Sequence, residues 1–192
     1  MAFVDGENLT SRFEAMVKGG RSIRNQAEEN YVGLKAVIHE PEGFVWTPST
    51  LRGIREDEDI LRIQYYTTYI GDDDGMESFI QRIAELRTAT HLGSLVARPM
   101  VRLIPKVYKK TLRKTKTKSV DINLCVDVLE YVSKDALDSV FLITGDVDYL
   151  PLIKSVMNAG KRVYLASLSE GLSTHLRYAT DYFISLDHVY FV

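Results

Sequence analysis

Two acidic motifs in this sequence follow short apolar stretches that are typical of buried strands. Asp5 comes directly after residues 2–4, and Asp146 comes after residues 141–145, the last of which is Gly145. In an open parallel sheet, ligands bind beyond the carboxyl ends of the strands. A glycine at such an end permits a tight turn and a close approach of a ligand to the backbone. The two aspartates are therefore candidates for chemistry at one edge of a sheet.

Asp121 brings a third carboxylate from a helix. It shares the helical spacing i, i+3, i+7 with Leu124 and Val128, which must be buried. At the first turn of this helix, the aspartate can point past the end of the sheet toward the other acids rather than into the core. Asp148 is a fourth candidate, either as a further ligand or as the cap of a helix that Pro151 helps to start.

Carboxylates gathered in this way repel one another. The repulsion is on the order of 4 kcal/mol per pair at about 4 Å and an effective dielectric constant of about 20. A Mg²⁺ or Mn²⁺ ion, which prefers oxygen ligands, would remove it and would activate water for phosphodiester hydrolysis. We therefore expect Asp5, Asp121, Asp146 and Asp148 to be metal ligands and catalytic groups, with Asn8 orienting water or a phosphate. Taken alone, Asp5 and Asp148 also fit simple turn and cap roles.

The rest of the chain alternates between stretches typical of strands and of helices, which predicts an α/β fold with a mainly parallel sheet covered on both faces. Strands are expected at residues 2–4, 60–70, 95–103, 140–143, 163–166 and 182–186. Helices are expected at residues 9–18, 76–92, 120–132, 151–159 and 172–178. Residues 21–59 fit neither pattern well, and we interpret them as an insertion within a single domain that spans residues 1–192.

Three motifs carry the candidate acids. They are Val4-Asp5-Gly6-Glu7-Asn8, the helix start Lys118-Ser119-Val120-Asp121 with Asp127 after it, and the segment from Thr144 to Pro151. Together they resemble the NYN domain, a PIN-like nuclease family that includes the LabA-like proteins. Residues 160–163 and 179–183 are similar to the closing strands of that family. The resemblance spans most of the chain and is weakest over residues 21–59.

The resemblance implies a PIN-like three-layer sandwich with strand order 3-2-1-4-5 and a possible extra edge strand, in which Asp5 meets Asp146. It also implies metal-dependent ribonuclease activity, with Thr144 in a substrate-positioning role. Asp127 lies about 120° around its helix from Asp121, so we expect it to support the ligands or the fold rather than to bind the metal. The sequence departs from the family pattern at Ser119, Thr144 and Val147. The valine removes a hydroxyl near the metal, but all four acids remain.

The composition is that of an ordinary folded protein, with 45% apolar and 26% charged residues in 192 positions. Cys125 is the only cysteine, which excludes a disulfide framework or a cysteine-based zinc site within the chain. No apolar run is long enough for a membrane helix, and Asp5 and Glu7 interrupt the stretch where a signal peptide would be apolar. We expect a cytoplasmic protein without a membrane partner.

The net charge of -2 hides a strong segregation of charge. Residues 98–118 hold nine Lys or Arg and no acid, which leaves 15 basic against 26 acidic residues elsewhere. Seven of the nine are candidates for phosphate contacts: Lys106, Lys109, Lys110, Arg113, Lys114, Lys116 and Lys118. Tyr108 could stack on a base. The alternative is a solvated surface loop, since charge runs are common at surfaces.

The hypothesis that follows is a nuclease, a hydrolase that acts as an endoribonuclease on single-stranded RNA, with RNA favoured over DNA. A noncatalytic RNA-binding or protein-interaction module with the same fold is the alternative, and self-association is left open. A third candidate is phosphate transfer through an aspartyl intermediate, which needs an Asp-x-Asp pattern where this chain has Glu7 as the second acid. The four histidines, His39, His91, His175 and His188, lack the spacing of metal ligands.

Overall fold

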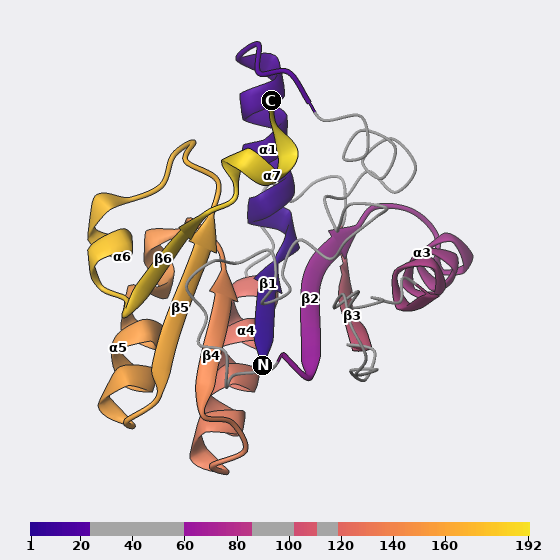
Figure 1. Ribbon diagram of the computed structural model, residues 1–192. Coiled ribbons are helices and arrows are strands. Elements are labelled where there is room, and N and C mark those ends of the chain that lie inside the picture. The colour runs from indigo at the N-terminus through magenta and orange to yellow at the C-terminus, as the bar shows by residue number, and fades with distance from the viewer. Residues whose placement is uncertain (24–59, 86–101, 111–118) are drawn as a thin grey trace, which may run out of the picture.

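The computed structural model describes residues 1–23, 60–85, 102–110 and 119–192, and its centre is a six-stranded parallel sheet (Figure 1). The strands lie in the order β3-β2-β1-β4-β5-β6, and each neighbouring pair is parallel. Their bounds are β1 Ala2–Asp5, β2 Arg62–Tyr69, β3 Arg102–Lys109, β4 Ser139–Ile143, β5 Arg162–Ser167 and β6 Tyr182–Ser185.

Helices cover both faces of this sheet and make a three-layer arrangement (Figure 1). One face carries α1 (Gly6–Lys18), α3 (Asp73–Glu85) and α7 (Asp187–Tyr190). The other carries α4 (Ser119–Ser133), α5 (Leu150–Asn158) and α6 (Thr174–Tyr178). A short 3-10 turn, η1 (Val147–Tyr149), joins the loop after β4 to α5.

Strand β1 lies in the middle of the sheet because its first three residues are apolar and pack on both faces. Ala2 and Val4 belong to the core beneath α1, whereas Phe3 belongs to the core beneath α4. Val4 pairs in register with Tyr65 of β2 on one side and with β4 on the other. Asp5 is the next residue, so the strand that builds the core also delivers a carboxylate to the carboxyl edge of the sheet.

The expected strand order is confirmed, and the extra edge strand is β6. The third strand lies later in the chain than residues 95–103, because β3 begins at Arg102 and includes Lys106 and Lys109. Residues 86–101 lie outside the described residues. Pro105 lacks a backbone N–H and is tolerated in β3 because this is an edge strand. Part of the basic stretch, including Lys106 and Lys109, therefore lies within the sheet.

Two other expectations about helices differ from the structure. The helix expected at residues 76–92 begins at Asp73 and is described to Glu85, and α7 was not expected from the pattern. The expected insertion at residues 21–59 falls almost entirely outside the described part of the chain.

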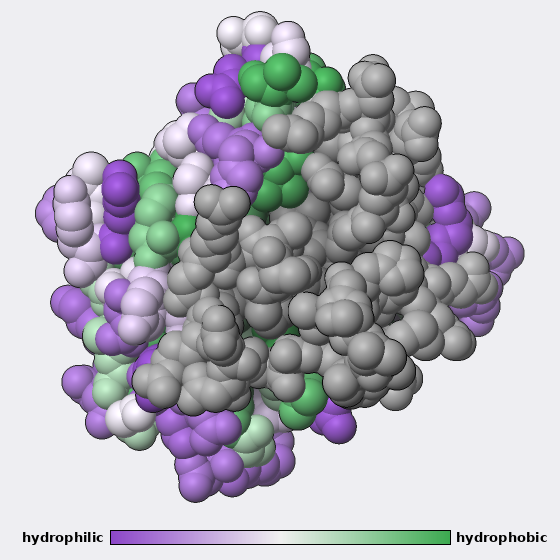
Figure 2. All heavy atoms as spheres, viewed as in Figure 1, coloured by the Kyte–Doolittle hydropathy of each residue, from purple (hydrophilic) through white to green (hydrophobic). Residues whose placement is uncertain are grey.

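None of the helices described is long and apolar enough to cross a membrane. On the face shown in Figure 2, hydrophilic side chains gather over α3 and around the turn between α4 and β4.

Candidate functional site

Asp5 is the buried centre of the candidate site. Its side chain is 2% exposed, and its Oδ1 accepts a 2.9 Å hydrogen bond from the backbone N–H of Asn8, which caps α1. The pKa of Asp5 is raised to about 7, chiefly by burial and also by the nearby charge of Asp121, while the hydrogen bonds from Asn8, Tyr149 and Thr144 oppose the rise. A carboxyl group with this pKa holds or releases a proton near neutral pH.

Tyr149 joins Asp5 to Asp121. Its hydroxyl oxygen lies 3.2 Å from Oδ2 of Asp5 and 3.2 Å from Oδ1 of Asp121. The hydroxyl has one proton and can donate it to only one carboxylate at a time. Burial, followed by the charges of the two aspartates, raises the pKa of Tyr149 above its usual range, so the hydroxyl stays protonated. Carboxylates from β1 and from the first turn of α4 therefore meet at one shared donor.

Acids on neighbouring elements also affect the pKa of Asp121. Burial is the main reason why its pKa is raised, and the negative charges of Asp146, Glu7 and Asp148 add to the rise. The sequence-predicted acids thus lie within electrostatic reach of one another at the carboxyl edge of the sheet. Direct contacts through a shared hydroxyl involve Asp5 and Asp121 only.

Asp146 and Asp148 lie in the turn that follows β4. Asp146 is partly exposed and Asp148 is exposed. The expected role of Asp148 as the cap of the helix started by Pro151 is wrong. Asp146 is the capping residue, and its Oδ1 accepts a 3.0 Å hydrogen bond from the backbone N–H of Asp148. The physical reason is that η1 starts the helical path at Val147, earlier than Pro151 indicates.

Thr144 holds the aspartates on either side of it in place. Its side chain is 1% exposed, and its Oγ1 donates to Oδ2 of Asp5 at 3.3 Å and accepts from the backbone N–H of Asp146 at 3.2 Å. Residue 144 was expected to position the substrate. Its contacts in the described structure are with the acids themselves, so it sets their relative positions.

Asn8 and Arg12 tie helix α1 to the loop that carries Asp146. Oδ1 of Asn8 accepts from the backbone N–H of Gly145 at 3.0 Å and from Nε of Arg12 at 2.8 Å. The guanidinium also donates to the carbonyl oxygens of Gly145, at 2.8 Å, and of Glu170. A Cβ at position 145 would lie 2.7 Å from Cζ of Arg12, so a larger residue there would displace the guanidinium. Asn8 therefore holds the loop, whereas its expected contact with water or phosphate stays a prediction.

Three lysines of the basic stretch, Lys106, Lys109 and Lys110, each pair with an acid. Lys110 contacts Glu7, which is one of the acids that act on Asp121, and Lys109 contacts Asp73 at the start of α3. These contacts bring the end of β3 close to the start of α1. The remaining candidates for phosphate contacts, Arg113, Lys114, Lys116 and Lys118, lie outside the described residues.

Asp127 lies away from the shared tyrosine hydroxyl, as its helical position predicts. Its Oδ2 accepts a 2.7 Å hydrogen bond from the hydroxyl of Tyr66 and lies 3.4 Å from Nζ of Lys106. It therefore links α4 to β2 and β3.

The chemistry of these side chains suits a divalent cation, but their spacing in the structure does not. Within residues 1–23, 60–85, 102–110 and 119–192, no three or more His, Cys, Asp or Glu side chains are arranged to hold a metal ion. The converging groups are nevertheless carboxylates, which are the preferred ligands of hard divalent cations. Burial is the largest cause of the raised pKa values of Asp5 and Asp121, and the negative charges of neighbouring acids add to it.

Three side chains of this site were missed in the sequence. Tyr149 and Arg12 join the acids and the loops, and Glu7 adds a charge near Asp121. Arg12 had a usable signal, because it stands one helical turn after Asn8 at the spacing i, i+4. Tyr149 had a weaker one, because an aromatic residue after a turn usually enters the core.

One solved structure and one curated sequence are similar to this chain. The structure of a protein of unknown function from Vibrio parahaemolyticus is similar over 100% of this chain and 94% of its own, with a TM-score of 0.56 and 14% identity, which shows a shared fold. An uncharacterized protein of Methanocaldococcus jannaschii is 34% identical over 67 residues. That match covers 35% of this chain and 28% of the relative, so the chain spans little more than a quarter of its length.

The family model of the NYN domain matches residues 1–187 and so covers nearly the whole chain. The matched region contains all four candidate acids, the tyrosine between two of them and every strand of the sheet. Nucleases of this family bind nucleic acid and generally depend on a divalent metal. The chain belongs to the NYN domain family, and this membership points to a nuclease of the PIN-like superfamily.

Proposed function

We propose that this protein is a Mg²⁺- or Mn²⁺-dependent nuclease that cleaves single-stranded RNA internally. The observation that carries the proposal is the meeting of Asp5 and Asp121 at the hydroxyl of Tyr149, at 3.2 Å from each. Two carboxylates from different elements, both with raised pKa values, form an incompletely neutralised negative centre at the carboxyl edge of a parallel sheet. A divalent cation is the partner that such a centre favours.

Asp5, Asp121, Asp146 and Asp148 are the residues that would hold the cation. When bound, it would lower the pKa of a water molecule and stabilise negative charge on a phosphoryl oxygen. Asp5 is suited to a fixed ligand, because the backbone N–H of Asn8 and the hydroxyls of Thr144 and Tyr149 hold it in one orientation. Asp148 is exposed and can turn toward a substrate as it arrives.

An acidic site needs help to attract a polyanion. Lys110 contacts Glu7 beside the acids, and the basic stretch continues after it through the lysines and arginine at positions 113–118. These cations would contact phosphates on the strand and offset the repulsion from the aspartates. Single-stranded RNA fits the proposal because a flexible strand can bring one phosphodiester to an acid that is only partly exposed, such as Asp146.

Cleavage assays with one matched pair of variants test the proposal. Asp146 follows β4, and the exposed Asp138 precedes the same strand at the opposite edge of the sheet. Asp146→Asn removes a charge but keeps an oxygen that can cap η1, so the fold should survive, while Asp138→Asn makes the same change away from the site. Labelled RNA and DNA are incubated with each protein in Mn²⁺, in Mg²⁺ and in chelator.

Wild type and Asp138→Asn should cut RNA internally with a metal and not in chelator. Asp146→Asn should lose about 100-fold or more of the rate, which corresponds to about 2.7 kcal/mol of transition-state stabilisation. Cleavage by Asp146→Asn at the wild-type rate would overturn the assignment. Preferred cleavage of DNA would overturn the substrate class.

A noncatalytic RNA-binding module is the second candidate. It is favoured by the absence, among the described residues, of three acids arranged to hold a metal ion, and by Val147 in the turn that carries Asp146. It predicts that wild type binds RNA with an affinity that chelator and Asp146→Asn leave unchanged, and that no metal supports cleavage.

A further inference from the structure

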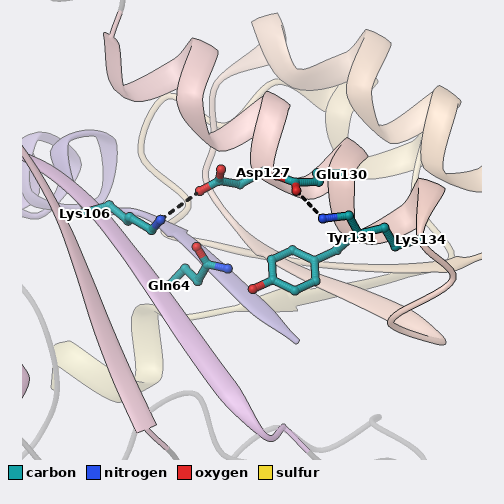
Figure 3. A pocket seen from close by; sticks show the side chains of 6 residues that line it. All are labelled: Gln64, Lys106, Asp127, Glu130, Tyr131 and Lys134. Carbon is teal, nitrogen blue, oxygen red and sulfur yellow. Dashed lines mark hydrogen bonds and ion pairs between the residues drawn. The ribbon is translucent and has the colours of Figure 1, made fainter.

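The lysines of β3 reach two different faces of the sheet, because side chains alternate along a strand. Lys106 reaches toward α4, where its Nζ lies 3.4 Å from Asp127 (Figure 3). Lys109 reaches the other face and contacts Asp73 at the start of α3. The pairing continues one residue past the strand, since the backbone N–H of Lys110 donates to the last carbonyl oxygen of β2 at 2.8 Å. The alternation therefore puts Lys110 on the side of the sheet that α4 covers.

Glu7 meets Lys110 beside the acids. It lies in the first turn of α1, just after the end of β1, and its carboxylate contacts the ammonium group of Lys110. The Lys110 side chain is only 15% exposed, whereas that of Lys109 is 44% exposed in its pair with Asp73. The charge of Glu7 also acts on Asp121. Of these two ion pairs, Glu7–Lys110 is therefore the more buried, and it lies close to the acids.

A buried ion pair and an exposed one respond differently to the loss of one partner. An exposed pair contributes little, because water solvates either charge alone. A mostly buried ammonium group that loses its carboxylate is costly, so its side chain moves to where water solvates it. Loss of the Glu7 carboxylate would therefore release Lys110 from its place beside the acids. Loss of the Asp73 carboxylate would leave Lys109 solvated as before.

The place of Lys110 suits contact with a phosphate. An ammonium group has three N–H donors, and Glu7 accepts from one of them, so donors remain for a phosphate oxygen. A phosphodiester close to Asp121 is repelled by the acids, and a fixed cation at this position offsets that repulsion. Glu7 also has a simpler role, because an acid in the first turn stabilises a helix. That role does not involve Lys110, so the two roles can be separated.

We propose that Glu7 is a positioning residue, which holds the ammonium group of Lys110 beside the acids so that it contacts a phosphate of the RNA strand. The inference rests on the proposed function for the identity of that strand. Glu7 carries the same sign of charge as RNA, so the removal of its charge alone would strengthen binding. Because Lys110 is released at the same time, we expect binding to weaken instead.

Binding of RNA without cleavage tests this expectation. Fluorescence anisotropy measures the affinity of a labelled uridylate octamer for each protein in chelator. Glu7→Gln in the otherwise wild-type protein should weaken binding about threefold or more. In a Lys110→Met background there is no ammonium group to hold, so Glu7→Gln removes only repulsion and should strengthen binding.

The exposed pair on the other face of the sheet is the matched control. Asp73→Asn is made in the otherwise wild-type protein and in Lys109→Met. Because Asp73 does not hold its lysine beside the acids, Asp73→Asn should not weaken binding in either background. Urea denaturation checks that every variant is folded.

NMR spectra give a direct readout of Lys110. The side-chain signals of isotope-labelled lysines are recorded, and the Lys110 signal is assigned by its absence in Lys110→Met. Addition of the octamer should shift this signal in wild type and should shift it less in Glu7→Gln. A role of Glu7 that is confined to the start of α1 would leave the shift the same in both proteins.

Several results would overturn the inference. They are unchanged or stronger binding by folded Glu7→Gln, the same weakening in both backgrounds of position 110, and a Lys110 signal that the octamer does not shift. Lysine-dependent weakening of the same size in Asp73→Asn would also overturn it. Absence of RNA binding by wild type would overturn the inference and the proposed substrate together. Failure of the nuclease function alone appears as absence of metal-dependent cleavage while the Lys110-dependent effect of Glu7→Gln persists.

Discussion

The hydroxyl of Tyr149 lies 3.2 Å from Oδ2 of Asp5, although 144 positions separate the two residues in the chain. The same hydroxyl lies 3.2 Å from Oδ1 of Asp121, so it can donate to either carboxylate. Tyr149 is 1% exposed, and its ring belongs to the core beneath α4 and α5. The rigid core thus holds one neutral donor between two acids, and the donor partly offsets their repulsion when no cation is present.

Tyr149→Phe should expose this role. The change removes a buried hydrogen bond to a carboxylate and should lower the free energy of unfolding by about 1–3 kcal/mol, as measured by urea denaturation. Because the four acids remain, metal-dependent cleavage should fall by only about tenfold, far less than in Asp146→Asn. Tyr178→Phe, at an exposed tyrosine, is the control and should behave as wild type. A Tyr149→Phe protein with wild-type stability would contradict the account.

The raised pKa of Asp5 predicts that the stability of the metal-free protein depends on pH. Its folded-state pKa is raised to about 7, so the folded state binds a proton that the unfolded state releases near its ordinary value. The contribution of Asp5 to the free energy of unfolding therefore falls as pH rises from about 4 to about 7, by up to about 1.4 kcal/mol per pH unit. Asp5→Asn should gain stability relative to wild type over this range.

The measurement is urea denaturation of wild type and Asp5→Asn in chelator at pH 5 and pH 8. The titratable or charged groups that interact with Asp5 are Asp121, Tyr149, Arg12, Cys125 and Tyr65. Asp121 is therefore tested alongside it, as Asp121→Asn. The same stability difference between wild type and Asp5→Asn at both pH values would contradict this prediction, because ionisation of Asp5 would then not change the free energy of unfolding.

The hydrogen bonds of Arg12 predict that this residue positions the loop that carries Asp146. Its guanidinium joins Asn8 to the carbonyl oxygens of Gly145 and Glu170, so it holds the loop that carries Asp146. Arg12→Lys keeps the positive charge but loses the fork of donors. We expect about a tenfold lower kcat with a smaller change in KM, and no restoration at any pH. Arg62→Lys, at an exposed arginine in β2, should change neither constant. An unaltered kcat in Arg12→Lys would remove this residue from the account.

The basic stretch predicts the salt dependence of RNA binding. Replacement of Lys109, Lys110, Arg113 and Lys114 with alanine should flatten the slope of log affinity against log salt by about one unit or less for each lost phosphate contact. Lys18→Ala and Lys154→Ala remove exposed lysines on α1 and α5 and should leave the slope unchanged. Equal slopes in wild type and the fourfold variant would exclude this stretch from the binding surface.

Much of the fold follows from periodicity in the sequence. In strands such as β4, the apolar residues after the first position are buried on both faces, and turn residues such as Gly145 follow the strand. β3 was harder to place because Lys106 and Lys109 interrupt the apolar pattern, and an edge strand need not bury both of its faces. α7 is only four residues long and offers too few turns for a helical period.

The roles of the acids as metal ligands stay predictions. The place of Asp5 and Asp146 at one edge of the sheet could be predicted, because aspartates after buried parallel strands must meet there. The groups that orient them could not. The hydroxyl of Tyr149 reaches Asp5 across 144 positions of the chain, and a sequence pattern contains no distance between such segments. The cap was assigned to Asp148 rather than to Asp146 for a similar reason, because η1 precedes α5 without a sequence signal of its own.

Binding of Mn²⁺ to the protein in the absence of RNA tests the central claim most directly, because it asks whether the four acids share one cation. Electron paramagnetic resonance can count the free Mn²⁺ that remains as the metal is added to wild type, Asp121→Asn, Asp146→Asn and Asp138→Asn. We predict saturable binding by wild type and Asp138→Asn, weakened about tenfold or more in Asp121→Asn and Asp146→Asn. Absence of saturable binding by wild type, or equal binding by all four proteins, would contradict the account.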